Sequence, residues 1–334
     1  MLYQKQNAAI IVLSRGCGNE LTMTLDSIWM QTYKHIKIFL VVSEVEESSL
    51  QNIYTSYKDK IKLIIRQGDY SLARVLNNTL KLAHCSYFAI VAAGDVWQSK
   101  SLETKVRFLE KNRGAFAVCS DFDVFDKSGI IQDSFFRAKE QFQDLEEGQE
   151  FLVEEVCRYL IQTNFRPFSA ALIKTESFFF FGPFDETIPG YADLDFFTKV
   201  GQKLQLGCIN KILVSRYFDI YKVSYYIEEN LKLRLAYLED VRSQAKRISR
   251  KYEYEVVCAI RANYSSWIRY LLKSREKNKA GKTAVECMSK YKVTPRLLFL
   301  FFKTLMPSLR SESKEKHDYF YLEKVRNDLL KLHF

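Results

Sequence analysis

Long apolar runs are missing from this 334-residue chain. No stretch reaches the roughly 18 consecutive apolar residues that a helix needs to cross a bilayer. The N-terminal segment 1–16 contains an apolar run of only six residues, and no small-residue cleavage site follows it. We therefore expect a first strand there rather than a signal peptide, and a protein located in the cytoplasm.

Paired cysteines are missing as well. The seven cysteines are odd in number and widely scattered, no CxxC pair occurs, and none is combined with a histidine at metal-ligand spacing. A disulfide framework or a zinc site would need such pairs. The pattern predicts reduced, structural thiols, which agrees with a cytoplasmic protein.

The first two thirds of the chain lack an excess of positive charge. Residues 1–216 hold 25 Lys and Arg against 26 Asp and Glu, whereas residues 217–334 hold 25 against 14. The net charge of +10 therefore belongs to the last third. We expect a near-neutral working domain over 1–216 and a basic region over 217–334 that meets something anionic.

The first part does contain apolar strands that alternate with amphipathic helices. Short apolar runs rich in β-branched residues predict strands at 8–14, 36–42, 61–65, 87–93 and 115–119. Helical spacing predicts helices at 20–31, 48–58, 71–84 with Ser71 as cap, and 99–112 with Ser99 or Ser101 as cap. This order is typical of an α/β protein with a mostly parallel sheet, and the continuously apolar strands indicate helices on both faces.

Polar residues gather where the predicted strands end. In such a sheet, ligands bind outside the carboxyl ends of the strands. These ends carry Ser14 and Arg15, Ser43 and Glu44, and a turn of small residues that finishes in Asp95. Asp95 is therefore either a ligand-binding acid or an ordinary turn acid.

Three stretches, in the right order, resemble the family 2 glycosyltransferases. They are ELTMTLDSIWMQTYKHIKIFLVV at 20–42, LNNTLKLAHCSYFAIVAAGDVWQSKSLETKVRFLEKN at 76–112, and SAALIKTESFFFFGPFDETIPGYADLDFFTKV at 169–200. The resemblance extends over roughly 8–216 and implies the GT-A fold, a Rossmann-like, mostly parallel sheet flanked by helices. The positions that match the family's signatures are Leu21, Leu25, Ser27, Ile28, Gln31, Thr32, Tyr33, Asn77, Ala83, Asp95, Trp97, Leu102, Gly182, Phe184, Asp185, Glu186, Asp193 and Asp195.

The resemblance also implies an activity, which is inverting transfer of a sugar from a nucleotide-diphosphate sugar, a UDP-sugar first of all. The acceptor would be a glycan, a lipid-linked intermediate or a glycoprotein in surface polysaccharide or glycoconjugate biosynthesis. The reaction needs positive charge at the leaving diphosphate and a carboxylate base for the acceptor hydroxyl. By their place in the motifs, Asp95 is the expected ligand of Mn²⁺ or Mg²⁺ and Asp193 the expected general base. The expected nucleotide-sugar contacts are Ser14, Arg15, Ser43, Glu44, Asn77 and Asp95.

The motifs that are acidic in the family contain fewer Asp and Glu residues in this chain. The acidic cluster after the fourth strand keeps only Asp95, the "DDGS" stretch is replaced by SEVE at 43–46, and the "ED" pair becomes Ala-Asp at 192–193. No histidine lies near Phe218, where the family often has one. The alternative is therefore a catalytically inactive GT-A-like partner subunit that binds a glycan or another transferase.

The last third predicts amphipathic helices at 224–252, 253–275, 294–309 and 316–334, with a polar break at 276–283. The apolar cluster at 294–309 is too short to span a bilayer and has basic flanks. Two interpretations stay open, namely peripheral binding to the anionic inner membrane face, or packing on the GT-A domain or on a second copy as a homodimer. The tail has no nucleic-acid motif, so we expect no nucleic-acid partner.

Overall fold

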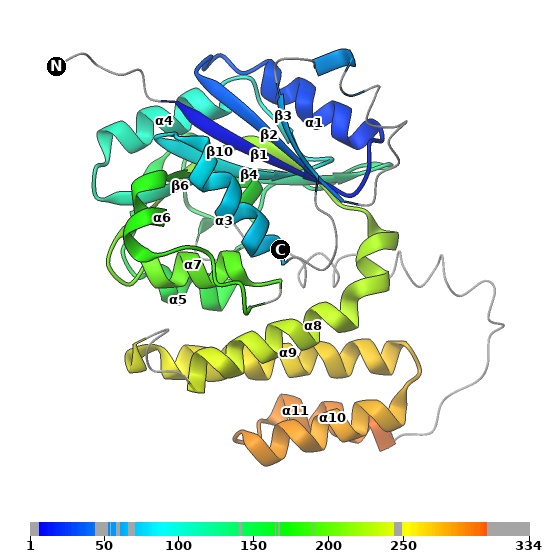
Figure 1. The fold of residues 1–334 in the computed structure, drawn as a ribbon. Helices are drawn as coiled ribbons and strands as arrows, with labels where there is room; N and C mark the ends of the chain where they lie inside the picture. The colour runs from blue at the N-terminus through cyan, green and yellow to red at the C-terminus, as the bar shows by residue number, and fades with distance from the viewer. Residues whose placement is uncertain are drawn as a thin grey trace. The chain divides into compact units, whose positions relative to one another are not determined.

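The computed structural model describes residues 7–43, 53, 55–57, 61–65, 71–139, 142–163, 165, 168–188, 190–243 and 249–305. The chain divides into two compact units. One comprises Met1–Val156 with Arg166–Phe218, and the other comprises Cys157–Phe165 with Asp219–Phe334 (Figure 1). Among the described helices, none combines the length and the hydropathy that crossing a bilayer requires.

Ten strands of the described residues form one sheet in the first unit, with the order β3-β2-β1-β4-β9-β6-β10-β5, while β7 pairs with β6 and β8 with β10. The bounds are β1 Ala8–Ser14, β2 Ile36–Val42, β3 Ile61–Ile65, β4 Tyr87–Ala92, β5 Val96–Trp97, β6 Ala115–Asp126, β7 Gly129–Gln132, β8 Glu150–Val153, β9 Ala171–Lys174 and β10 Gln205–Tyr217. β9 runs antiparallel to both β4 and β6, whereas β3, β2, β1, β4, β6 and β10 share one direction. Their carboxyl ends therefore lie along one edge of the sheet.

Helices connect these strands, as Figure 1 shows. They are α1 Asn19–Trp29, α3 Leu72–Ala83, α4 Ser101–Lys111, α6 Thr175–Phe181 and α7 Ala192–Val200. The helix α5 Val156–Thr163 follows β8 along the chain, but from Cys157 on it belongs to the second unit. α1 buries Leu21, Leu25 and Ile28, the apolar positions whose spacing predicted it. Because the strands are apolar on both faces, the core forms where the helices cover the sheet.

The predicted order of elements is confirmed, with local corrections. The side chain of Ser71 accepts from the N–H of Arg74, as expected of the α3 cap. The cap predicted for α4 is wrong, since the helix begins at Ser101 after Lys100 without a side-chain cap. The strand predicted at 115–119 continues to Asp126, because β10 pairs along its length. The helix predicted at 48–58 falls largely outside the described residues.

The second unit is helical, and α9 packs against α8, α10 and α11 (Figure 1). The bounds are α8 Ile220–Ser243, α9 Glu253–Lys273, α10 Lys277–Lys290 and α11 Pro295–Leu305. The polar break predicted at 276–283 is wrong, because Ala280, Thr283, Ala284 and Cys287 give α10 a buried face despite Gly281. The predicted helix at 316–334 lies outside the described residues.

A lysine is buried within the first unit. Lys105 of α4 has no exposed surface, its Nζ donates to Ser101 Oγ at 3.0 Å, and it lies 5.0 Å from the centre of the Trp97 ring. Burial lowers the pKa of Lys105 to about 7, because surroundings of low dielectric disfavour the charged form. The unfolded chain therefore binds a proton that the folded chain releases between about pH 7 and the ordinary lysine pKa of about 10.4.

Lys105→Met should stabilise the protein most strongly at or below pH 7. There, wild type carries a buried charge whose cost, from the pKa difference, is of the order of 4 kcal/mol before lost contacts are subtracted. The free energy of unfolding of wild type rises between about pH 7 and pH 10. The melting temperature of Lys105→Met should therefore exceed that of wild type by less at pH 10 than at pH 6. Thermal melts at pH 6, 8 and 10 measure it. Lys111→Met, on the exposed end of the same helix, is the control, and a gap that does not change with pH would contradict the burial argument.

Candidate functional site

The ends of β1, β2 and β4 lie next to one another at the carboxyl edge of the sheet. The N–H of Ser43 donates to the carbonyl of Ser14 at 3.0 Å, and the N–H of Ala93 donates to the carbonyl of Leu13 at 2.8 Å. The Ser14 hydroxyl bonds to the carbonyl of Gly16 in its own turn, and Arg15 is exposed. Three of the predicted strand-end segments thus come together, while Glu44 lies outside the described residues.

The turn that carries Asp95 depends on two neighbours. Gly94 has φ +106°, and a Cβ there would lie 2.9 Å from the Cβ of Tyr217, so glycine is needed for both conformation and space. The N–H of Gly94 donates to Thr24 Oγ1 at 2.9 Å, and that hydroxyl donates to the carbonyl of Asp95 at 2.8 Å. Thr24 of α1 therefore holds the turn from one side and Tyr217 closes the other.

The Asp95 carboxylate joins this turn to the end of β10. Asp95 is 3% exposed, its Oδ1 accepts from the N–H of Tyr217 at 2.9 Å, and its Oδ2 lies 3.9 Å from Arg216 Nε. Burial raises the pKa of Asp95, while the Arg216 charge and the Tyr217 N–H oppose that rise. The buried carboxylate and the partly buried guanidinium form one ion pair at the edge where ligands bind in this architecture.

Arg216 and Tyr217 are site residues that the sequence reasoning missed. The guanidinium of Arg216 lies over the Phe122 ring, with 4.9 Å between Cζ and the ring centre. A signal was present, because the apolar run that forms β10 ends in Ser-Arg-Tyr at 215–217. The strand-end rule that singled out Asp95 would have singled out Arg216 as well.

A pocket of about 390 Å³ opens beside the Asp95 turn, within the size range of small-molecule sites. The rings of Phe125 and Tyr217, 5.4 Å apart, form an aromatic wall. Asp95, Arg216 and Asp193 are not among the lining residues. The lining residues are Asn19, Glu20, Met23, Gly94, Phe125, Asp126, Lys127 and Tyr217.

Asp193 lies in the first turn of α7 and is 3% exposed. It is not the helix N-cap, because Tyr191 occupies that position. Asp195 also lies in the first turn, and its Oδ2 lies 3.6 Å from Lys199 Nζ. The general-base role of Asp193 stays a prediction.

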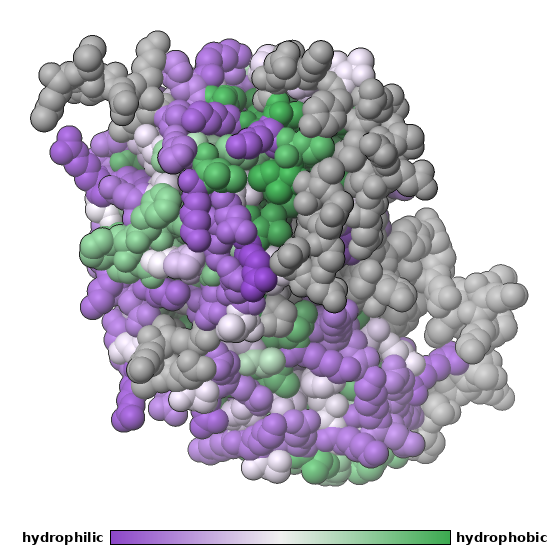
Figure 2. Space-filling view, viewed as in Figure 1, coloured by the Kyte–Doolittle hydropathy of each residue, from purple (hydrophilic) through white to green (hydrophobic). Residues whose placement is uncertain are grey.

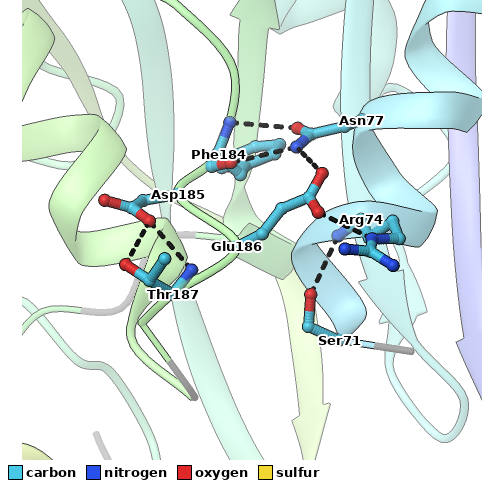
Figure 3. Close-up of polar contacts among 7 residues, drawn as sticks. All are labelled: Ser71, Arg74, Asn77, Phe184, Asp185, Glu186 and Thr187. Carbon is cyan, nitrogen blue, oxygen red and sulfur yellow. Dashed lines mark hydrogen bonds and ion pairs between the residues drawn. The ribbon is translucent and has the colours of Figure 1, made fainter. Parts of the chain in front are cut away.

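Asn77 links α3 to the loop at 182–190 (Figure 3). Its Nδ2 donates to the carbonyl of Phe184 at 2.9 Å and to Glu186 Oε1 at 3.2 Å, and its Oδ1 accepts from the Phe184 N–H at 3.0 Å. Arg74 Nε donates to Glu186 Oε2 at 2.7 Å. The side chain is buried, so these contacts support the positioning of the loop that leads to α7.

Other motif residues, on α1 and just after it, contact the segment that follows Asp95. Gln31 Nε2 donates to the carbonyl of Gln98 at 2.8 Å, and its Oε1 accepts from the N–H of Leu102 at 2.9 Å. Ser27 Oγ accepts from the N–H of Trp97 at 3.1 Å. The first family stretch thus holds the segment that immediately follows Asp95.

The model of the family described as "Glycosyl transferase family 2" matches residues 9–178, about half of the chain. The chain belongs to glycosyl transferase family 2. EpsE of Bacillus subtilis (strain 168) is 30% identical over 125 residues, which are 36% of this chain and 45% of that protein. The UDP-Glc:alpha-D-GlcNAc-diphosphoundecaprenol beta-1,3-glucosyltransferase WfaP of Escherichia coli is 25% identical over 111 residues, 33% of this chain and 43% of that protein. This family 2 chain therefore matches less than half the length of these curated relatives.

Solved structures confirm the GT-A fold of this family 2 chain. The mannosyltransferase PcManGT from Pyrobaculum calidifontis, in complex with GDP-Man and Mn²⁺, superposes with a TM-score of 0.59 at 14% identity, covering 98% of this chain and 85% of that one. S. aureus TarS 1–349 superposes with a TM-score of 0.52 at 13% identity, covering 96% and 91%. The identities are low, so these likenesses show the fold alone.

The donor atoms at Asp95 are compatible with a divalent cation. Asp95 Oδ2 is buried and accepts no hydrogen bond, and a carboxylate oxygen suits Mn²⁺ or Mg²⁺. Within the described part of the chain, no three His, Cys, Asp or Glu side chains gather in a way that would hold a metal ion. A cation at Asp95 would therefore need most of its ligands from a bound diphosphate.

Proposed function

We propose that this chain is an inverting glycosyltransferase that moves a sugar from a nucleotide-diphosphate sugar, in the first place a UDP-sugar, to a glycan acceptor. The observation that carries the proposal is the buried Asp95 carboxylate, 3.9 Å from the partly buried Arg216 guanidinium, at the carboxyl edge of the sheet. Gly94 and Tyr217, the chain neighbours of these two residues, line a pocket of about 390 Å³ there. Family membership and GT-A neighbours, one solved with UDP and one with GDP-Man, support it.

Each residue of the proposed site has a defined task. Asp95 orients the end of β10 and, where a divalent cation binds, supplies its carboxylate oxygen; such a cation would neutralise charge on the leaving diphosphate. Arg216 adds fixed positive charge next to it. Asp193 accepts the proton of the acceptor hydroxyl as that oxygen attacks the anomeric carbon from the face opposite the diphosphate. Ser14, Arg15, Ser43 and Glu44 contact the nucleotide.

The proposed setting is surface polysaccharide or glycoconjugate biosynthesis, with a glycan, lipid-linked or glycoprotein acceptor. We place the protein in the cytoplasm, at the inner membrane face. The name of WfaP includes a diphosphoundecaprenol acceptor, which supports a lipid-linked class. We also propose that residues 1–216 form the glycosyltransferase domain and that residues 217–334 form the basic helical region.

The second candidate is an inactive GT-A-like partner subunit. One observation favours it, because the Asp95 carboxylate is 3% exposed and holds a backbone N–H, as a purely structural acid would. The same contacts are compatible with an active transferase. A measurement of donor binding therefore distinguishes the transferase from the inactive subunit.

Thermal melts with UDP-, GDP-, CMP- and dTDP-sugars, each with and without Mn²⁺, test the proposal. We expect one nucleotide class to raise the melting temperature, because a ligand at about 100 times its Kd stabilises the folded state by about 2.7 kcal/mol. The same donor should be hydrolysed slowly or transferred. No shift with any donor would leave only the subunit reading.

A further inference from the structure

The outer face of α11 is apolar although it is exposed. The helix packs through Leu297 and Leu300, which are buried. At 3.6 residues per turn, the opposite side of the helix carries a second apolar stripe, which we name the α11 face. Its residues are Leu298 (39% exposed), Phe299 (58%), Phe302 (56%) and Leu305 (65%).

Two basic residues lie on the same helix as this face, in a segment of the chain rich in Lys and Arg. Residues 275–305 hold eight Lys and Arg and two Glu, a net charge of +6, and α11 itself contains no acid. Arg296 and Lys303 on α11 are exposed, and Lys303 Nζ lies 4.7 Å from the centre of the Phe299 ring. Positive charge is therefore in contact with the apolar stripe.

A groove of about 520 Å³ between α10 and α11 extends this surface. α11 supplies the apolar side chains of Phe301 and Leu305, and α10 supplies Lys277 and Lys282. Figure 2 shows apolar side chains at its lower edge, over the elements that Figure 1 labels α10 and α11. The groove repeats the combination of an apolar floor with basic side chains.

We infer that the α11 face docks on an anionic lipid bilayer, with α11 lying in the plane of the interface. An apolar stripe with basic flanks gains free energy both from burial among acyl chains and from attraction to anionic head groups. Eleven residues of helix measure about 17 Å, far less than a bilayer core of about 30 Å, so the helix lies on the membrane rather than across it. The inference concerns a different surface from the proposed transfer site and does not depend on turnover.

Exposed apolar residues alone do not support the same inference elsewhere. Phe179 and Phe180 of α6 are 61% and 83% exposed, more than the two phenylalanines of the α11 face. The first turn of α6 carries an acid, Glu176, and its last turn carries no base. This pair is therefore a control of matched side chains without the basic setting.

Flotation of the full chain with vesicles tests the inference, using phosphatidylcholine alone and phosphatidylcholine with about one third phosphatidylglycerol. Wild type should float with the anionic vesicles only, and raising salt from about 0.1 to 0.5 M should weaken binding several-fold. The double variant Phe299→Ser with Phe302→Ser should bind at least about tenfold more weakly. Phe179→Ser with Phe180→Ser should bind as wild type does.

The outcomes decide between lipid and protein partners. Melting temperatures within about 2 °C of wild type establish that the exposed substitutions leave the fold intact. The inference is overturned if wild type does not bind anionic vesicles. It is also overturned if the variant Phe299→Ser with Phe302→Ser still floats with them. Sedimentation velocity covers the remaining alternative, because a wild-type dimer that the α11 variant dissociates, with no vesicle binding, would assign the face to a second copy.

Discussion

Asp95→Asn is expected to abolish donor-dependent stabilisation and to lower kcat/KM by about 10²–10³-fold while the protein stays folded. Asparagine keeps an oxygen that can accept from the Tyr217 N–H, so the link to β10 survives. It removes the negative charge that pairs with Arg216 and that would bind a cation. Melting curves with and without donor, together with initial rates, measure the two effects separately.

Asp121→Asn is the matched control for this substitution. Asp121 is as buried as Asp95, but its carboxylate serves the loop after β7 by accepting from the Phe136 N–H at 3.0 Å and from Ser134. Its replacement should cost stability and leave donor affinity unchanged. Wild-type turnover by Asp95→Asn would remove Asp95 from the reaction and leave it a structural acid.

Asp193→Asn should lower kcat by about 10²–10⁴-fold with little change in donor affinity. A general base acts on the acceptor hydroxyl, so its loss slows the chemical step but leaves nucleotide binding intact. Rates at saturating donor and acceptor measure kcat, and the donor-induced shift in melting temperature reports binding.

Asp195→Asn, two residues along α7, is the control for Asp193→Asn. Both acids are almost fully buried in the first turn of the same helix, and Asp195 pairs with Lys199. If Asp193 only stabilises α7, the two variants should have similar values of kcat. If Asp193 is the general base, kcat should fall strongly in Asp193→Asn alone. Equal, small losses of kcat in both would assign the base to another residue.

Five of the parallel strands, β1, β2, β3, β4 and β6, were predictable because each begins as a compact apolar run, whereas β10, which is parallel to β6, was not predicted. β1, β2 and β3 agree with their predicted bounds, since nothing but the local pattern was needed. The sequence of β9 does not predict a strand in this way. It has only four residues, and its position between β4 and β6 depends on pairing with strands far away in the chain. The helix α10 was missed for a different reason, because the polar residues of 276–283 were interpreted as a break although α10 begins there, at Lys277, and has a buried face.

The site was predictable only up to the residues that stand directly at strand ends. The edge position of Asp95 followed from strand order, but its partners Arg216 and Tyr217 lie more than a hundred residues later. The motif positions Gln31 and Asn77 matched the family, yet their hydrogen bonds go to the backbone of segments beside the site and, for Asn77, also to the Glu186 side chain. A matched motif position thus identifies a residue that the fold needs, and contacts are required to say for what.

The hydrogen bond from Tyr217 to Asp95 spans 122 residues of chain. At roughly 5–20 residues per second, a ribosome takes several seconds or more to add β10 after Asp95 has been made. During that time Asp95 lacks its hydrogen bond from the Tyr217 N–H. The carboxyl edge of the sheet is therefore complete only after β10, the last strand of the sheet in the chain, has been synthesised. The stretch 9–178 that matches the family ends before that strand, and a protein truncated there would leave synthesis with the edge unfinished.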